Sequence, residues 1–186
     1  MSMPHLRVAP RLLLALIAAL IAMPVYASLK AGVMAPSFTA DASLAGQPYS
    51  FSLSEALKKG PVVLYFYPAA FTSGCNIEAH KFAEATEQFK ALGAQVIGVS
   101  KDDVDTLHKF SVSECGGKFA VAADPKLVVA KSYDAKMPLV GYANRTSYVI
   151  TPDGKILYVY SSLSPDDHVK NTLAALKTWR DAQPKS

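Results

Sequence analysis

Residues 65–75 read Tyr-Phe-Tyr-Pro-Ala-Ala-Phe-Thr-Ser-Gly-Cys, and they join a predicted strand to a predicted helix. The strand is the apolar, β-type run of residues 62–67, which ends at Pro68. A short loop of small residues follows, and the helix is predicted to begin at Cys75 and to stop at Gly93. The first N–H groups of a helix lack partners within it, and the helix dipole adds partial positive charge there. A cysteine in this position is therefore favoured as the reactive thiolate.

Strands and helices alternate on both sides of this stretch. Before it we expect an extended segment at 29–41, a turn at 46–48, a half-buried strand at 49–53 and a short helix at 54–60. After it we expect a buried strand at 94–100, a helix at 102–115, a brief strand at 119–123, a short helix from Asp124 to Tyr133, a hairpin of 146–151 with 155–160, and a final helix capped by residues 164–167. This order predicts an α/β fold, with a central mixed β-sheet flanked by helices on both faces.

The N-terminus is predicted to be a signal peptide, residues 1–27. It has a basic start, an apolar run at 12–23 and small residues at the cleavage-determining positions of Val25-Tyr26-Ala27. The apolar run is shorter than the roughly 20 residues that a membrane span needs, so an uncleaved anchor is the weaker interpretation. The other 159 of the 186 residues, 28–186, suffice for one domain. We expect the mature protein to be soluble, free of the membrane and periplasmic.

Charge and composition exclude several classes of protein. Without Arg7 and Arg11, 17 of the 19 basic residues remain against 15 acidic ones, a net charge near +2. No Lys/Arg block or aromatic-basic alternation suggests nucleic-acid binding. The histidines His108 and His168 show no metal-ligand spacing with cysteines or carboxylates, so neither a metal nor another cofactor is expected.

The chain has two cysteines, Cys75 and Cys115. In an exported protein the default interpretation is a structural disulfide. Closing a loop of about 40 residues would stabilise the fold by roughly 4 kcal/mol in the chain-entropy model. The alternative is that Cys75 is a reactive thiol, because a merely packed cysteine needs no proline, threonine and glycine at fixed positions before it.

The pattern Pro68-x-x-x-Thr72-x-x-Cys75 resembles the active-site signature of the peroxiredoxins. The wider string YFYPAAFTSGCNIEA most resembles the bacterioferritin-comigratory, or peroxiredoxin Q, branch, and the resemblance covers essentially all of the mature chain. It implies a thioredoxin-like fold of the peroxiredoxin type. It also implies a thiol-dependent peroxidase that reduces hydrogen peroxide and organic hydroperoxides and is recycled by a thioredoxin-like reductant.

The resemblance assigns roles to four residues. Cys75 would attack the peroxide, Thr72 would orient it, Pro68 would shield the sulfur, and Arg145 would bring a guanidinium beside the cysteine. Each residue also has a plainer interpretation: a packed core cysteine, a helix-capping threonine, a strand-ending proline and a solvated surface arginine. Arginine suits the role because it stays charged and offers forked donors to peroxide oxygens.

The sequence departs from this branch at one position. Many members carry a second cysteine five residues after the first, where this chain has His80, about 140° around the helix and predicted to be a surface residue. Cys115 is then the only intramolecular candidate to resolve the oxidised Cys75. The alternatives are a one-cysteine enzyme that uses an external thiol, and a structural or chaperone-like domain with a Cys75–Cys115 disulfide. A monomer or weak homodimer is expected.

Overall fold

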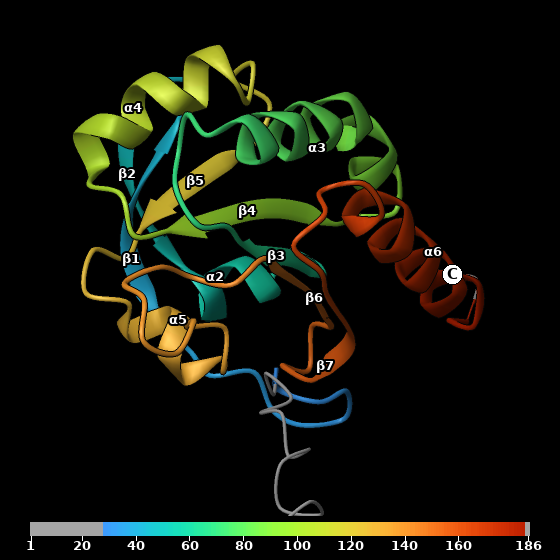
Figure 1. The fold of residues 1–186 in the computed structure, drawn as a ribbon. Helices are drawn as coiled ribbons and strands as arrows, with labels where there is room; N and C mark the ends of the chain where they lie inside the picture. Colours follow the sequence, from blue (N-terminus) through green and yellow to red (C-terminus); the bar gives the residue numbers. More distant parts are fainter. Residues whose placement is uncertain (1–27, 185–186) are drawn as a thin grey trace, which may run out of the picture.

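The computed structural model describes residues 28–184, which form a seven-stranded mixed sheet with helices on both faces (Figure 1). The predicted signal peptide lies outside the described residues. In chain order the elements are β1 (Thr39–Leu44), β2 (Gln47–Ser52), α2 (Leu53–Leu57), β3 (Val62–Phe66), α3 (Ser73–Ala91), β4 (Gln95–Ser100), α4 (Val104–Ser113), β5 (Ala120–Ala123), α5 (Val128–Ser132), β6 (Thr146–Ile150), β7 (Ile156–Ser161) and α6 (His168–Asp181). None of the helices within the described range is long and apolar enough to cross a bilayer.

The strands lie in the order β2-β1-β5-β4-β3-β6-β7. The central strands β3, β4 and β5 are parallel, whereas β1 and β6 run antiparallel to them and each forms a hairpin with the strand at its edge. The predicted α/β class and mixed sheet are therefore confirmed.

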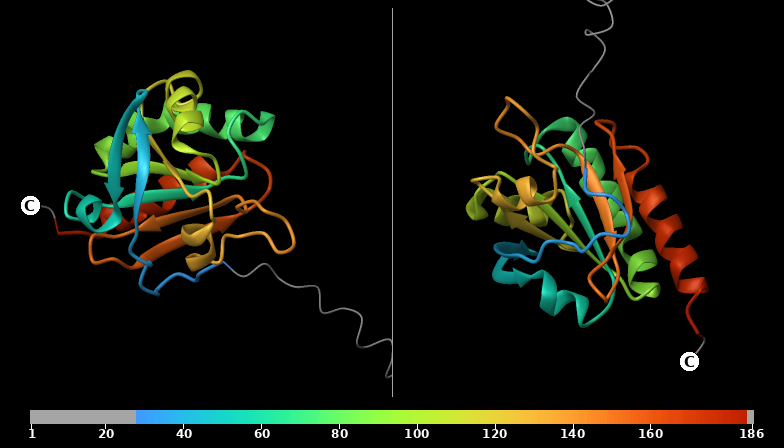
Figure 2. Two further views of the ribbon diagram at one scale, coloured as in Figure 1. Left: turned by 90° about the vertical axis from the view of Figure 1, so that its left-hand side faces the viewer. Right: turned by 90° about the horizontal axis from the view of Figure 1, so that it is seen from below.

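Strand β3 explains why the apolar run before Pro68 shows no polar alternation. Val62, Leu64 and Phe66 belong to a core cluster under α2 and α5, while Val63 and Tyr65 belong to a second cluster under α3, α4 and α6. Figure 2 shows these two groups of helices on opposite faces of the sheet. A strand covered on both faces needs apolar residues at every position.

The prediction was wrong at the N-terminal end of the sheet. Residues 39–44 form strand β1, which was expected only as part of an extended segment, and β2 begins at Gln47 inside the expected turn. The turn is instead made by Ala45 and Gly46, both with positive φ (51° and 76°), as in the tight turns of β-hairpins. The sequence TADASL hides the strand because Ala and Asp are depleted in strands and only Ala42 and Ser43 are buried.

Several helix ends also differ from the prediction. Helix α3 begins at Ser73, with Thr72 as its N-cap, so Cys75 lies inside the first turn instead of starting it. Helix α4 ends at Ser113 and leaves Cys115 in the turn beyond. Helix α5 begins at Val128, later than expected, and its N-cap residue is Leu127, not Asp124. The Asp124 carboxylate still accepts hydrogen bonds from the amides of Val128 and Ala130 at 2.8 Å each.

Candidate active site

The pairing of β3 with β6 brings the predicted site residues together. Phe66, the last residue of β3, pairs with Thr146, the first residue of β6. Arg145 directly precedes β6, so it lies at the end of the strands where the chain leaves β3 for the loop to α3. That loop returns the chain to the same edge at the first turn of α3, which carries Cys75.

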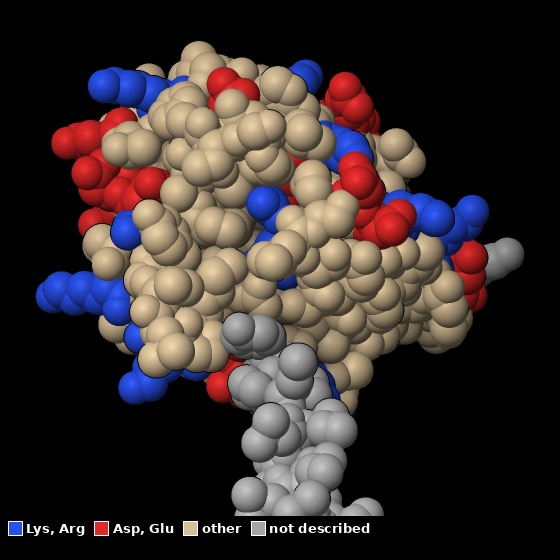
Figure 3. All heavy atoms as spheres, in the orientation of Figure 1, with Lys and Arg blue, Asp and Glu red and all other residues tan. Residues whose placement is uncertain are grey.

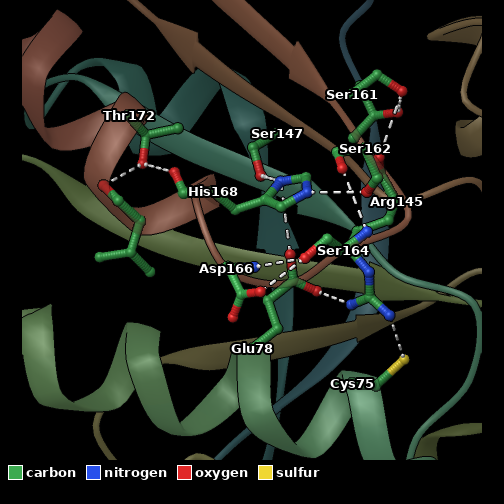
Figure 4. A network of polar contacts seen from close by, with 12 residues as sticks. Cys75, Glu78, Arg145, Ser147, Ser161, Ser162, Ser164, Asp166, His168 and Thr172 are labelled. Atoms are coloured by element: carbon green, nitrogen blue, oxygen red, sulfur yellow. Dashed lines mark hydrogen bonds and ion pairs between the residues drawn. The ribbon is translucent and has the colours of Figure 1, made fainter.

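Each nitrogen of the Arg145 guanidinium has a partner (Figure 4). Nε donates to the Leu163 carbonyl oxygen at 3.0 Å, Nη1 donates to the Glu78 carboxylate, and Nη2 donates to the Cys75 sulfur at 3.5 Å. Arg145 is 5% exposed and Cys75 is 1% exposed. Burial opposes the charge of Arg145, but Glu78 and Cys75 outweigh it and raise the pKa of the guanidinium. The fork is thus a fixed positive charge against the sulfur.

Gly74 gives the guanidinium room to approach. A Cβ atom at this position would lie 3.1 Å from Arg145 Nη2, closer than an ordinary van der Waals contact. A side chain at position 74 would therefore press on the group that contacts Cys75 and require it to shift. Gly74, in the first turn of α3, has a steric function that its place in the sequence did not reveal.

The loop between β3 and α3 is held by Asp102. Its Oδ2 accepts hydrogen bonds from the Ala70 amide and the Ser100 hydroxyl, both at 2.7 Å. Phe71 has a φ of 62°, a left-handed conformation that is uncommon for an aromatic residue. Its ring packs edge-on against that of Phe110, with 5.3 Å between the ring centroids. These contacts fix the loop that precedes the cysteine.

Thr72 and Pro68 lie in this loop. Thr72 is exposed and occupies the N-cap position of α3, but its hydroxyl donates to the Ala69 carbonyl at 3.0 Å and makes no capping hydrogen bond. The plainer interpretation of Thr72 as a side-chain cap is therefore wrong. Pro68 is half-buried and follows the end of β3 by two residues.

Two buried residues behind Arg145 were not predicted. Glu78 and His168 are both 0% exposed, and Glu78 joins the guanidinium to the imidazole, its Oε1 lying 3.6 Å from His168 Nδ1. Burial raises the pKa of Glu78 to about 7, against the lowering effect of Arg145, and burial lowers the pKa of His168 to about 4. Glu78 follows Cys75 by three residues, one helical turn, and that spacing was the one signal available.

Cys115 and Cys75 are both free thiols in the same core cluster, under α3 and α4. Cys115 is fully buried, and burial, with a smaller effect of Glu114, raises the pKa of its thiol. His80 lies on the surface as predicted, and its Nε2 is 3.0 Å from Glu114 Oε2. Among residues 28–184, no three or more His, Cys, Asp or Glu side chains gather in a way that would hold a metal ion.

A mostly apolar groove of about 450 Å³ adjoins Arg145. It is lined by Met137, Pro138, Val140, Asn144, Ser161, Ser162 and Leu163. Asn144 is the chain neighbour of Arg145, and Leu163 supplies the carbonyl that holds its Nε. Figure 3 shows that uncharged side chains cover most of the face seen in Figure 1, with charges of both signs mainly toward its rim.

Comparison with known proteins identifies the family. The AhpC/TSA family model matches residues 31–159. The chain is 33% identical over 158 residues to chloroplastic peroxiredoxin Q from Sedum lineare, covering 84% of this chain and 82% of that protein. The chain is a peroxiredoxin of the AhpC/TSA family. The crystal structure of peroxidoxin BcpB from Mycobacterium tuberculosis is similar to this peroxiredoxin, with 34% identity and a TM-score of 0.73, covering 81% of this chain and 97% of that chain. Peroxiredoxin Q from Xanthomonas campestris is 26% identical with a TM-score of 0.66, covering 75% of this chain and 90% of that chain.

These similarities confirm the predicted branch, the thioredoxin-like fold and the thiol-dependent peroxidase activity. The site of this peroxiredoxin holds a buried sulfur on the first turn of a long helix, with a guanidinium beside it. Such an arrangement stabilises a sulfur anion. The same donors can stabilise the negative charge on the oxygen that is released when a peroxide O–O bond breaks.

Proposed function

We propose that Cys75 is the peroxidatic cysteine and that it reduces hydrogen peroxide and organic hydroperoxides. The thiolate attacks the terminal oxygen of the hydroperoxide, so an S–O bond forms as the O–O bond breaks. Cys75 becomes a sulfenic acid, and the leaving oxygen takes up a proton to give water or an alcohol. Sulfur is oxidised and the peroxide is reduced, one proton is consumed, and no other oxidant or reductant takes part in this step.

The observation that carries this proposal is the contact of Arg145 Nη2 with the Cys75 sulfur at 3.5 Å inside a buried site. In the proposal, Arg145 stabilises both the thiolate and the negative charge that grows on the leaving oxygen. Thr72, one turn before the sulfur, offers its hydroxyl oxygen to orient the peroxide, and Pro68 shields the sulfur from water.

The apolar groove beside Arg145 supports organic hydroperoxides as substrates. A peroxide group bound between Cys75 and Arg145 would direct its organic part toward Asn144 and Leu163, at the edge of the groove. Met137 and Val140 would then cover that part by apolar contact. Hydrogen peroxide would need only the polar end of the site.

We also propose that Cys115 resolves the sulfenic acid. Its thiolate attacks the Cys75 sulfur, an S–S bond forms and water leaves, and a thioredoxin-like dithiol later reduces the disulfide. Because burial raises the pKa of Cys115, it is an unreactive thiol in the present arrangement. The turn that carries Cys115 must therefore move before the reaction. Gly116 and Gly117, both with positive φ, follow Cys115 directly and give this segment the backbone freedom to move.

The replacement Cys115→Ser tests the resolving role. Wild-type enzyme treated with one equivalent of peroxide is expected to lose both thiols and form one intramolecular disulfide. The variant is expected to accumulate Cys75 sulfenic acid, because no second sulfur can attack it, and to lose most of its turnover with thioredoxin. Mass spectrometry of the oxidised products identifies each species.

A stable Cys75 sulfenic or sulfinic acid in the wild type, with Cys115 still free, would contradict the resolving role. The enzyme would then be a one-cysteine peroxidase that uses an external thiol. Both outcomes leave Cys75 as the peroxidatic residue, so the two parts of the proposal are tested separately.

We further propose that the enzyme acts in the periplasm after loss of residues 1–27, where a thioredoxin-like protein recycles it. The N-terminal pattern of a basic start, an apolar run and Val25-Tyr26-Ala27 supports export. Its oligomeric state, a monomer or a weak homodimer, stays a prediction.

Export predicts a defined mature end. Expression of the full chain in a bacterium should give a periplasmic protein that starts at Ser28, because cleavage after Ala27 removes the apolar run. Intact mass measurement of the periplasmic fraction checks this. Ala27→Leu, which places a bulky residue at the cleavage position, should leave the precursor uncut, and a full-length cytoplasmic product from the natural sequence would disprove export.

A further inference from the structure

Glu78 has one carboxylate oxygen without a hydrogen-bond partner. Oε2 accepts from Arg145 Nη1, whereas Oε1 is buried and receives no hydrogen bond from any of the described residues. An ionised carboxylate with an unsatisfied buried oxygen is costly, since that oxygen has lost its water. Figure 4 shows Oε1 directed at the imidazole of His168, which is equally buried.

The hydrogen bonds of His168 fix its tautomer. Nε2 lies 3.0 Å from the Ser162 carbonyl oxygen, which can only accept, so Nε2 carries the hydrogen. In the neutral ring, Nδ1 then holds a lone pair, which accepts a hydrogen bond from the Ser147 hydroxyl at 2.8 Å. Glu78 Oε1 lies 3.6 Å from the same nitrogen, so it faces an acceptor and not a donor. If Glu78 were ionised, two acceptors would face each other in a buried space.

We propose that Glu78 carries a proton on Oε1, directed at Nδ1 of His168, in the reduced enzyme. This inference rests on the proposed function of Cys75. With Glu78 ionised, two buried anions would share the single charge of Arg145. With Glu78 protonated, the whole charge of the guanidinium remains for the thiolate and for the leaving oxygen. His168 is thus a positioning residue that acts through Glu78 and Arg145.

The charged and titratable groups around the pair agree with this assignment. Burial raises the pKa of Glu78 to about 7, with Arg145 opposing it. Burial lowers the pKa of His168 to about 4, which Arg145 reinforces and Asp167 opposes. Cys75 lies one helical turn before Glu78, and Glu78 also acts on the buried Tyr65 hydroxyl, contributing to the raised pKa of Tyr65, which is due mainly to burial. The Tyr160 ring lies 4.8 Å from the imidazole of His168, measured between ring centroids. The proton therefore resides on the carboxyl group and is lost as the pH rises above neutrality.

Loss of this proton should lower the reactivity of Cys75. The wild-type rate constant for sulfenic acid formation is expected to fall roughly tenfold from about pH 7 to about pH 9. In Glu78→Gln the side-chain amide imitates the protonated carboxyl group: its oxygen accepts from Arg145, and its uncharged NH2 group takes the place of Oε1 facing His168. The variant should therefore show no alkaline decline, with rates at the two pH values within about twofold of each other.

Thr172→Val is the matched control. Thr172 is buried on the same helix as His168, and its hydroxyl donates only to the backbone carbonyls of His168 and Val169. The Thr172→Val replacement removes a buried hydroxyl but leaves Glu78 unchanged, so the rate constant for sulfenic acid formation should still fall between about pH 7 and about pH 9. A Glu78→Gln enzyme that keeps the wild-type decline would overturn the proposal.

Infrared spectroscopy gives a readout independent of catalysis. Reduced wild-type enzyme at neutral pH should show the carbonyl band of a buried carboxylic acid, present in Thr172→Val and absent in Glu78→Gln. Absence of this band from the wild type would mean that Glu78 is ionised and would refute the inference. If the band is present but Cys75→Ser still reduces peroxide, the proposed function fails while the proton assignment stands.

Discussion

Cys75→Ser is expected to reduce peroxide consumption to the rate of buffer alone. Serine is nearly the same size, so the helix and the contact with Arg145 can remain. Its hydroxyl, however, is not ionised near neutral pH, and only the anion attacks a peroxide oxygen rapidly. Stopped-flow measurement of peroxide loss, with enzyme in excess and no reductant, measures the first chemical step directly.

The matched control for this variant is Cys115→Ser, which also removes one buried thiol from the same core cluster. It should still form the sulfenic acid in the first turnover. Thermal unfolding of both variants shows whether either has lost its fold. A folded Cys75→Ser protein that consumes peroxide at a rate close to wild type would disprove the peroxidatic role of Cys75.

The central part of the fold was predictable because its signals are local. A short, β-branched apolar run such as that of β3 is typical of a strand covered on both faces, and Pro68 limits its length. Strand β1 was not predictable, because its identity depends on its neighbours. Ser43 is buried under α4, where its hydroxyl lies 3.0 Å from that of Ser111 and 2.9 Å from His108 Nδ1. No local pattern in the sequence indicates such contacts.

The candidate site divides in the same way. Cys75 and Arg145 could be predicted because each stands in a recognisable sequence context, although 70 positions separate them and only the register of β3 with β6 explains how they meet. Glu78 and His168 could not be predicted in this way. A glutamate within a helix and a histidine after Ser164-Pro165-Asp166-Asp167 both look like solvated residues, and their importance comes entirely from burial.

The burial of these two residues changes how the arginine should be interpreted. A guanidinium that only neutralised a carboxylate would be a structural ion pair, and such pairs contribute little net stability. Here the same guanidinium contacts a sulfur through one nitrogen and a carboxyl group through another, and a backbone carbonyl holds the third. Its position is fixed before a peroxide arrives, which is the condition for strong electrostatic stabilisation of a transition state.

Arg145→Ala is therefore expected to lower the rate of sulfenic acid formation by about 10²–10³-fold, corresponding to about 2.7–4 kcal/mol of transition-state stabilisation. Arg145→Lys should recover only part of this loss, since one ammonium group cannot donate to the sulfur, Glu78 and the Leu163 carbonyl with the same geometry. The measurement is single-turnover peroxide reduction for the three proteins.

Loss of stability must be separated from loss of chemistry, because removing Arg145 leaves Glu78 buried without its partner. Breaking a buried pair in this way destabilises proteins by about 3–5 kcal/mol when the remaining group stays charged. The double variant Arg145→Ala/Glu78→Gln removes the guanidinium and leaves no ionisable carboxyl group in its place, and it should unfold at a higher temperature than Arg145→Ala. If it also regains most of the wild-type rate, Arg145 serves only to neutralise Glu78. If the rate stays low while stability returns, the guanidinium acts on the sulfur and the leaving oxygen, as the 3.5 Å contact with Cys75 implies.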